Sequence, residues 1–401
     1  MKISFYTLGC KLNQAETASL KSDLENQGFL SCIWSEEDIA IVRACGVTCG
    51  ASATTREMIR QAKRRGSYVV AVGCLENKDL KEIDFVSKDN YEIIEHLLEK
   101  FGRDSSIPQN DSGTVTKTRA LVKIQTGCNF ACTYCIITKF RGKSRSKNPE
   151  EIIKQILKLK KEGFKEVTLT GVNICQYLSH DLGHDMNLAE LIKTILKETK
   201  ISRIRLGSLD PRLITDELIK TYLKNSDRLL PHWHLSLQSG SNKILEGMAR
   251  GYTQKQYFEI IKKLRNKNPL FSFTTDIIVG FPEETEENFK ETCDFVKKCE
   301  FTKVHVFPYS KRPGTIADEM KNQVHDQTKK DRVRKLIEIT NKVGEKFKKN
   351  FLDLERKILF EHKKDGHWQG FTPEYIRVKL KSKEDLENKV KTIKIDKKNL
   401  V

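Results

Sequence analysis

The chain has 401 residues, of which 38% are hydrophobic and 31% charged. No apolar run is long enough to span a bilayer, so the composition excludes a helical membrane protein and predicts a soluble one with two or three domains. Lysine and arginine number 72 against 54 acidic residues, a net charge of +18 that fits either simple solubility or a polyanionic partner such as nucleic acid.

The first residues and the cysteine content together predict a cytoplasmic protein. Residues 1–9 lack the long apolar core and the cleavage site of a secretory signal. Eleven cysteines in a chain without an export signal favour metal binding or catalysis over a disulfide framework.

Residues 1–115 are predicted to form an α/β domain. Strands that alternate with helices indicate a parallel sheet, and here strands are expected at 2–7, 38–42 and 68–72, with helices at 16–26, 53–64 and 91–101. The segment 102–118 is rich in Ser, Asp, Gly and Thr, as linkers are, which places a domain boundary near residue 115.

One cysteine follows each of these three strands. Cys10, Cys45 and Cys74 each lie beside a glycine at the exit of a predicted strand. Because open parallel sheets bind ligands beyond the carboxyl ends of their strands, we expect the three thiols to meet at one edge. The alternative is that these are core residues, because isolated cysteines are more often small buried side chains than ligands. Cys49, four residues after Cys45, is an alternative ligand that the sequence leaves open.

Residues 116–350 are predicted to form a partial barrel. Helices with clear start signals separate six expected strands, at 119–126, 165–170, 202–208, 232–238, 271–279 and 302–308. Six βα units are too few for a closed eightfold barrel, so an open (β/α)6 barrel is expected, with its chemistry on the loops that follow the strands.

Three further thiols follow the first of these strands, with the spacing C-x3-C-x2-C. Cys128, Cys132 and Cys135 cannot by themselves fill the four positions of a structural zinc site. An iron–sulfur cubane held by three cysteines would keep one iron open for a substrate or cofactor. The five cations from Lys139 to Lys147 come next, and they suit phosphate contacts or a solvated segment.

The other strand ends carry polar residues that suit a small molecule with amine, carboxylate and ribose groups, although βα loops are polar in any case. His232 and His234 share one face of a strand and are expected in the barrel wall or facing substrate.

Residues 351–401 are predicted to form a small antiparallel β-barrel. Alternating segments at 356–361, 375–380 and 390–395 read as its strands. Trp368, Phe371 and Tyr375 interleave with basic residues, as on a surface that stacks nucleic-acid bases, but they could equally be the core of the barrel.

The cysteine loop, with Tyr134 before its third thiol, resembles the loop of the radical SAM superfamily. The whole chain is similar to the methylthiotransferases through the stretches Thr7–Gln14, Ala44–Thr48, Val72–Cys74, Arg141–Ser146, Thr170–Ile174, Leu235–Ser241, Asp276–Pro282 and Gly370–Pro373. Within that family, Lys11–Gln14 and Gly142–Ser146 look most like the MtaB branch.

This resemblance implies two 4Fe–4S clusters and S-adenosylmethionine as cofactors. An auxiliary cluster is expected on Cys10, Cys45 and Cys74 in an N-terminal methylthiotransferase domain, 1–115. The cluster that binds S-adenosylmethionine is expected on Cys128, Cys132 and Cys135 in a radical SAM barrel, 116–350. Residues 351–401 correspond to a TRAM-like RNA-binding domain. The expected contacts to S-adenosylmethionine are Tyr134, Gly171, Ser208, Gln238 and Asp276.

The resemblance also implies a reaction. A 5′-deoxyadenosyl radical from S-adenosylmethionine would activate C2 of N6-threonylcarbamoyladenosine at position 37 of tRNA, and the auxiliary cluster would supply the sulfur. The implied partners are the tRNA anticodon stem-loop, an electron donor protein and a sulfur source. Alternative substrates are isopentenyladenosine in tRNA or a ribosomal protein. The alternative from another class is a zinc-containing RNA-binding protein without enzymatic activity.

Overall fold

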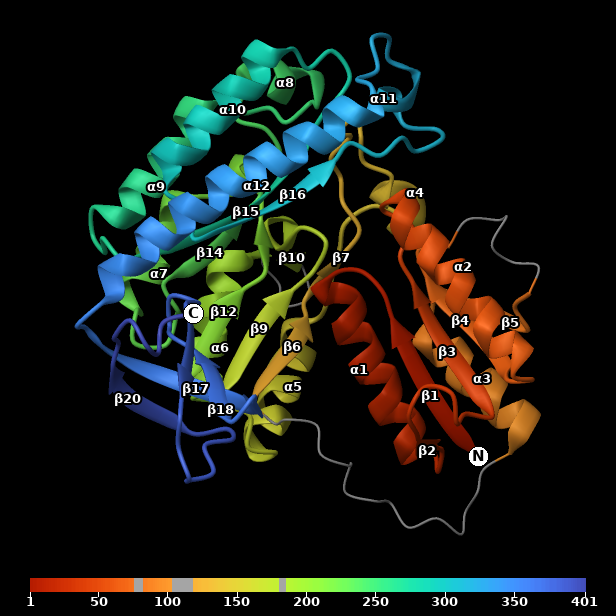
Figure 1. Cartoon of the computed structure of the whole chain (residues 1–401). Helices are drawn as coiled ribbons and strands as arrows, with labels where there is room; N and C mark the ends of the chain where they lie inside the picture. Colours follow the sequence, from red (N-terminus) through yellow and green to blue (C-terminus); the bar gives the residue numbers. More distant parts are fainter. Residues whose placement is uncertain (76–81, 103–117, 180–184) are drawn as a thin grey trace. The chain divides into compact units, whose positions relative to one another are not determined.

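The computed structural model describes residues 1–75, 82–102, 118–179 and 185–401 (Figure 1). It divides into two compact units: the first comprises Met1–Val115, Cys135–Lys143 and Ser310–Gly314, and the second comprises Thr116–Tyr134, Ser144–Tyr309 and Thr315–Val401. Within the ranges described, no helix is both long and apolar enough to cross a membrane.

The first unit is a parallel five-stranded sheet with the order β2-β1-β3-β4-β5. Helices α1 and α3 cover one face and α2 the other, with a separate apolar cluster on each face. The elements are β1 (Lys2–Thr7), α1 (Lys11–Asn26), β2 (Leu30–Ser31), β3 (Ile39–Ala44), α2 (Cys49–Arg64), β4 (Tyr68–Gly73), β5 (Phe85–Ser87) and α3 (Asn90–Phe101).

The three predicted strands of this unit are confirmed, and β2 and β5 are short additions at the sheet edges. Helices α1 and α2 begin earlier than predicted. Helix α1 starts at Lys11 with Cys10 as its N-cap residue. Helix α2 starts at Cys49, and the hydroxyl of Thr48 accepts a hydrogen bond from the amide of Ala51. Both helices therefore begin directly at the strand exits where the thiols lie.

The second unit contains the six predicted βα strands, all parallel, in the order β6-β9-β12 and β13-β14-β15-β16. The third predicted strand is interrupted at Gly207: β12 pairs with β9, and β13 pairs with β14. The strands are β6 (Arg119–Lys123), β9 (Glu166–Thr170), β12 (Arg203–Leu206), β13 (Ser208–Leu209), β14 (His232–Leu235), β15 (Ser272–Val279) and β16 (Lys303–Pro308).

Helices cover the outside of these strands (Figure 1). They are α5 (Pro149–Lys161), α6 (Leu188–Thr199), α7 (Asp216–Lys224), α8 (Asn242–Gly247), α9 (Gln254–Arg265), α10 (Glu286–Cys299) and α12 (Asp326–Lys348). The side chains of the N-cap residues Asn148, Thr215, Thr253 and Thr285 accept hydrogen bonds from backbone amides of their helices.

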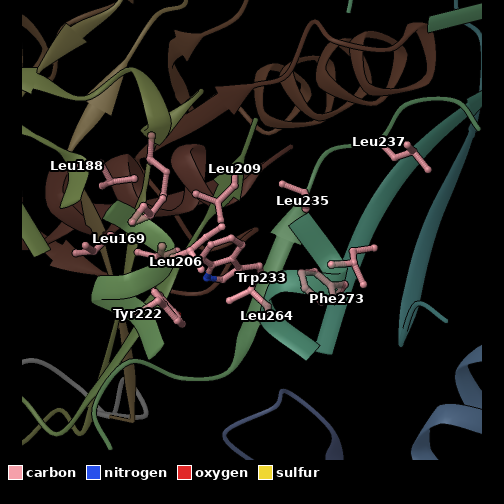
Figure 2. Close-up of a cluster of buried hydrophobic side chains, with 14 of the residues drawn as sticks. Leu169, Leu188, Leu206, Leu209, Tyr222, Trp233, Leu235, Leu237, Leu264 and Phe273 are labelled. Atoms are coloured by element: carbon pink, nitrogen blue, oxygen red, sulfur yellow. The ribbon is translucent and has the colours of Figure 1, made fainter. Parts of the chain in front are cut away.

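The core of this unit lies between the strands and these outer helices. Alternate strand residues point to opposite faces, so Trp233, Leu235 and Phe273 pack outward with helix residues such as Tyr222 and Leu264 (Figure 2). The opposite face of the same strands carries polar side chains, including His234 and Thr274. The expected partial (β/α)6 barrel is confirmed.

The tail forms an antiparallel sheet in the order β19-β18-β17-β20, with the bounds β17 (Glu355–Lys364), β18 (His367–Phe371), β19 (Arg377–Leu380) and β20 (Val390–Lys394). Strand β18 was not predicted, because Gly366 and Gly370 suggested turns. The residues after β20 pair with β19 and so complete the small barrel. The amide of Lys379 donates to the carbonyl of Asn399 at 2.8 Å, and Val378 forms an antiparallel β-bridge with Leu400.

The aromatic side chains of the tail are used inside the protein. Trp368 is buried in the core of the small barrel. Tyr375 stacks on Phe371 with ring centroids 4.7 Å apart, and the guanidinium groups of Arg119 and Arg205 lie 5.2 and 4.5 Å from its centroid. Of the two interpretations of these aromatics, packing is therefore the one observed.

A buried ion cluster joins the tail to the barrel strands. Glu166 accepts from Nε of Arg203 at 2.9 Å and from Nε of Arg205 at 2.8 Å, and Nη1 of Arg205 donates to the carbonyl of Pro373 at 3.2 Å. Burial alone would raise the pKa of Glu166, but the charges of Arg205, Arg203 and Arg119 hold it at about 2. The tail thus closes the end of the barrel at which β6, β9 and β12 begin.

We expect Glu166→Gln to lower the free energy of unfolding by roughly 3–5 kcal/mol, because it leaves two buried guanidinium groups without their carboxylate. The pKa of Glu166 is depressed from 4.5 to about 2, so its stabilisation is present above pH 4.5 and disappears as the pH falls toward 2. Urea unfolding at pH 7 and at lower pH measures both effects.

The matched control is Glu217→Gln, which breaks an exposed pair with Lys193. It should cost at most about 1 kcal/mol. A Glu166→Gln protein as stable as this control at neutral pH would contradict the structural role of the ion cluster.

Candidate functional site

Three thiols converge at the exits of adjacent parallel strands in the first unit. Cys10 follows β1, Cys45 follows β3 and Cys74 follows β4; Cys45 and Cys74 are buried and Cys10 is exposed. Backbone hydrogen bonds continue past the strands, from Leu8 to Arg43 at 3.0 Å and from Cys74 to Ala44 at 3.3 Å. Burial is the main cause that raises the pKa of Cys45 and of Cys74, and the charges of the neighbouring thiols add to both shifts.

Glycines allow this close approach. Gly9 has φ +97°, and a Cβ added there would lie 2.9 Å from the Sγ of Cys45. A Cβ at Gly46 would lie 2.8 Å from the carbonyl oxygen of Cys74. Only glycine fits both positions without a shift of the thiol-bearing chain.

Cys49 has different neighbours. Its Sγ accepts a hydrogen bond from the hydroxyl of Ser310 at 3.3 Å and lies 3.6 Å from the carbonyl oxygen of Lys311. These contacts favour Cys45 over Cys49 as the third thiol of the group.

A buried arginine adjoins this thiol group. Arg141 donates to Glu16 at 2.9 Å and to the side-chain oxygen of Asn13 at 2.6 Å, and its hydrogen bond and charge act to lower the pKa of Cys74 against the larger effect of burial. Glu16 also accepts from Arg43 at 3.0 Å. One carboxylate therefore serves two guanidinium groups beside the thiols.

The sequence interpretation of Arg141 was wrong, since this arginine is engaged inside the first unit instead of lying on a basic surface. Lys139, Lys143 and Arg145 of the same segment are exposed. The partners of Arg141, Asn13 and Glu16, occupy buried positions on α1, and no local sequence pattern linked Arg141 to them.

The second thiol loop leaves the short strand β7 (Gln125–Thr126) of the second unit. The Sγ of Cys128 accepts from the amide of Phe130 at 3.5 Å. The hydroxyl of Thr133 donates to the carbonyl of Gly247 at 2.8 Å, at the end of α8. Cys135, three residues after Cys132, begins the segment Cys135–Lys143 of the first unit.

Two arginines that sequence reasoning did not single out contact Cys132. Its Sγ lies 3.3 Å from Nη1 of Arg250 and 3.7 Å from Nη2 of Arg212. Asp210 bridges the two, at 2.6 Å from Arg212 and 3.4 Å from Arg250. Burial would raise the pKa of Asp210, but the hydrogen bond from Arg212 and the two positive charges lower it, so the carboxylate stays ionised.

The residues expected to contact S-adenosylmethionine lie in or next to the barrel strands, except Tyr134 of the cysteine loop. Ser208 begins β13, Gly171 directly follows β9 and Asp276 lies in β15. Gln238, with φ +70°, exchanges backbone hydrogen bonds of 2.8 and 2.9 Å with Asp276 and Ile278. Tyr134 packs against an apolar cluster that includes Met248 and Phe281. Their role as cofactor contacts stays a prediction.

The two histidines of β14 belong to the polar face of the barrel wall. His232 is buried and hydrogen-bonded to the hydroxyl of Thr274 at 3.0 Å. His234 contacts the same hydroxyl at 3.0 Å and a carboxylate oxygen of Asp276 at 3.2 Å. The Sγ of Cys175 accepts a hydrogen bond from the amide of Asp210 at 3.4 Å, and burial raises the pKa of Cys175 to about 12.

The donor chemistry of both thiol groups fits iron–sulfur clusters. In the part of the chain that the structure describes, no three His, Cys, Asp or Glu side chains converge closely enough to bind a single metal ion. Thiolates that hold a four-iron cluster each bind a different iron and so lie farther apart than the ligands of one ion. The cationic contacts at Cys132 suit a negatively charged group there.

Comparison with known proteins matches both units. The description of the radical SAM superfamily matches residues 122–296, and that of uncharacterized protein family UPF0004 matches residues 2–93. The chain is 38% identical over 371 residues to the threonylcarbamoyladenosine tRNA methylthiotransferase MtaB of Aquifex aeolicus, covering 86% of this chain and 90% of that protein.

Two further proteins extend this comparison. The tRNA-2-methylthio-N(6)-dimethylallyladenosine synthase of Natranaerobius thermophilus is 36% identical over 389 residues, covering 89% of this chain and 85% of that protein. The solved structure of the radical S-adenosylmethionine methyltransferase TsrM from Kitasatospora setae shares the fold, with a TM-score of 0.57 at 13% identity over 79% of this chain and 77% of that chain.

We expect Gly9→Ala to reduce the iron bound after anaerobic reconstitution, by up to one cluster per chain, because the new methyl group displaces the Cys45 thiol. The control Gly66→Ala has a similar φ of +82° but open space around the added Cβ. Both variants carry the same backbone strain, about 1–2 kcal/mol. Iron and sulfide analysis measures the difference, and equal iron contents would contradict the predicted thiol site.

Proposed function

This chain belongs to the radical SAM methylthiotransferases, and on that premise we propose that it inserts a methylthio group at C2 of N6-threonylcarbamoyladenosine at position 37 of tRNA. The observation that carries the proposal is the thiol group of Cys10, Cys45 and Cys74, which is present in addition to the radical SAM loop. An enzyme that only generates a radical needs the loop alone, whereas one that also inserts sulfur needs a second site.

Each thiol group would hold one 4Fe–4S cluster. Cys128, Cys132 and Cys135 would bind the cluster that carries S-adenosylmethionine, and Cys10, Cys45 and Cys74 the auxiliary cluster. When bound, these groups supply the reductive cleavage of S-adenosylmethionine and the sulfur atom that is transferred.

The residues of the chain would bind and orient S-adenosylmethionine. We propose that Ser208, Gln238 and Asp276 hydrogen-bond S-adenosylmethionine at the ends of the barrel strands. Gly171 is the further proposed contact, and a Cβ there would meet the side-chain oxygen of Gln125 at 2.7 Å, so this strand end requires glycine. Tyr134 anchors its part of the loop against the apolar cluster around Met248.

The charge of the chain suits a tRNA substrate. The exposed cations Lys139, Lys143 and Arg145 would contact phosphates near the SAM-binding loop. The TRAM-like tail would contribute through its lysines, since Trp368, Phe371 and Tyr375 are engaged in packing. We further propose an electron donor protein and a sulfur source as partners and the cytoplasm, where thiols stay reduced, as the location.

The substrate choice within tRNA rests on the relatives. The Aquifex aeolicus relative is named for threonylcarbamoyladenosine and has the higher identity, 38% against 36% for the relative named for dimethylallyladenosine. Isopentenyladenosine is therefore the second candidate substrate.

We expect Cys10→Ala to cleave S-adenosylmethionine but to form no methylthiolated nucleoside, because it loses one ligand of the auxiliary cluster only. Cys49→Ala is the matched control and should keep forming product, since Cys49 contacts Ser310. Chromatography of the cleaved cofactor and mass spectrometry of the digested tRNA measure the two outputs. Methylthiolation by Cys10→Ala would refute the proposed site of the auxiliary cluster.

Nucleoside mass spectrometry of tRNA from cells lacking the protein tests the substrate. The methylthio form of threonylcarbamoyladenosine should disappear while its unmodified precursor accumulates. Loss of a methylthio-isopentenyl nucleoside instead would select the second candidate. Metal analysis of the anaerobic protein separates both from an RNA-binding zinc protein, which would contain zinc without sulfide.

A further inference from the structure

Cys132 is contacted by two guanidinium groups. Nη1 of Arg250 lies 3.3 Å from its Sγ, and Nη2 of Arg212 lies 3.7 Å away. Arg250 is only 4% exposed, so solvent does little to screen its interaction with the sulfur. By contrast, the Sγ of Cys128 in the same loop accepts a hydrogen bond from the backbone amide of Phe130.

Other groups fix both arginines in place. Asp210 binds both guanidinium groups. Arg250 also donates to the carbonyl of Ser236 at 3.3 Å and to the hydroxyl of Tyr252 at 3.2 Å. Arg212 lies 3.4 Å from the ring centroid of Phe130, within the cysteine loop itself.

The charges in this group do not cancel. Two guanidinium groups share the single carboxylate of Asp210, which leaves one positive charge beside the sulfur of Cys132. Hydrogen bonds and positive charge at a ligand sulfur favour the more negative, reduced form of an iron–sulfur cluster. Arg250 satisfies both conditions through one nitrogen atom.

We propose that Arg250, assisted by Arg212 and held by Asp210, is a positioning residue that raises the reduction potential of the cluster on the SAM-binding loop. This inference rests on the cluster proposed at Cys128, Cys132 and Cys135. The step concerned is the gain of one electron from a low-potential carrier, such as a reduced flavin or iron–sulfur protein. The bond from Cys132 to iron persists, and no proton is transferred.

A purely structural role makes a different prediction. An arginine that only ties Ser236 and Asp210 together would affect folding and leave the potential unchanged. An arginine that only binds S-adenosylmethionine would affect the potential solely when the cofactor is present. Measuring the potential without S-adenosylmethionine therefore separates the proposed role from both.

The measurement requires a protein with a single cluster. The full chain with Cys10, Cys45 and Cys74 changed to alanine keeps the loop ligands and serves as the parent. After anaerobic reconstitution, redox titration followed by electron paramagnetic resonance gives the midpoint potential. Arg250→Met should lower the ratio of reduced to oxidised cluster about tenfold at a fixed potential, equivalent to about 59 mV for a one-electron couple.

Three more variants complete the test. Arg250→Lys keeps the charge and should recover part of the shift, and Arg212→Met should cause a smaller shift because its contact with Cys132 is longer. The control Arg265→Met removes a partly buried arginine of the second unit, which donates to the carbonyls of Phe271, Cys299 and Glu300. Its potential should equal that of the parent.

A potential unchanged in Arg250→Met, with the cluster intact, would overturn the inference. If that variant assembles no cluster, Arg250→Lys and Arg212→Met carry the measurement, and parental potentials in both would overturn it equally. A parent that binds no cluster at all would instead refute the proposed iron–sulfur site.

Discussion

A carboxylate shared by two arginines, whose side chains are at most 13% exposed, is the interaction on which the candidate functional site and the tail depend. Among the described residues it is found in the first unit, beside the Cys128–Cys135 loop and where the tail meets the barrel. The three groups are Glu16 with Arg43 and Arg141, Asp210 with Arg212 and Arg250, and Glu166 with Arg203 and Arg205. Each group carries one uncompensated positive charge in a poorly hydrated place. Such a charge is costly unless a further electron-rich partner lies beside it.

The three groups meet this requirement in different ways. At Arg141 and Arg250 the partner is a thiol, that of Cys74 or Cys132. At Arg205 it is the ring of Tyr375, 4.5 Å away, whose face attracts cations. The same arrangement therefore lies beside cysteine thiols after the carboxyl ends of the strands and joins the tail to the barrel at their amino ends. Burying these arginines costs little free energy because each site places a thiol or an aromatic ring beside the positive charge.

The third group, around Glu166, is part of a larger contact between the tail and the barrel strands. Tyr375 also lies 4.8 Å from the ring of His232, and the hydroxyl of Ser272 donates to the carbonyl of Glu374. The tail thus contacts the first residues of β12, β14 and β15 and closes that end of the barrel. The cysteine loop and the proposed cofactor contacts lie away from the end that the tail closes.

Much of this site could be predicted from the sequence, because strand exits are local features. An apolar run followed by a glycine and a cysteine places Cys10, Cys45 and Cys74 at one sheet edge without knowledge of any contact between them. The arginines could not be predicted in this way, since Arg250 lies 118 residues from Cys132 and reaches it through a long side chain. Its position depends on Asp210 and Ser236, from two other strand ends. A sequence pattern locates side chains that directly follow a strand. The position of a long side chain that reaches across loops is known only from the packed structure.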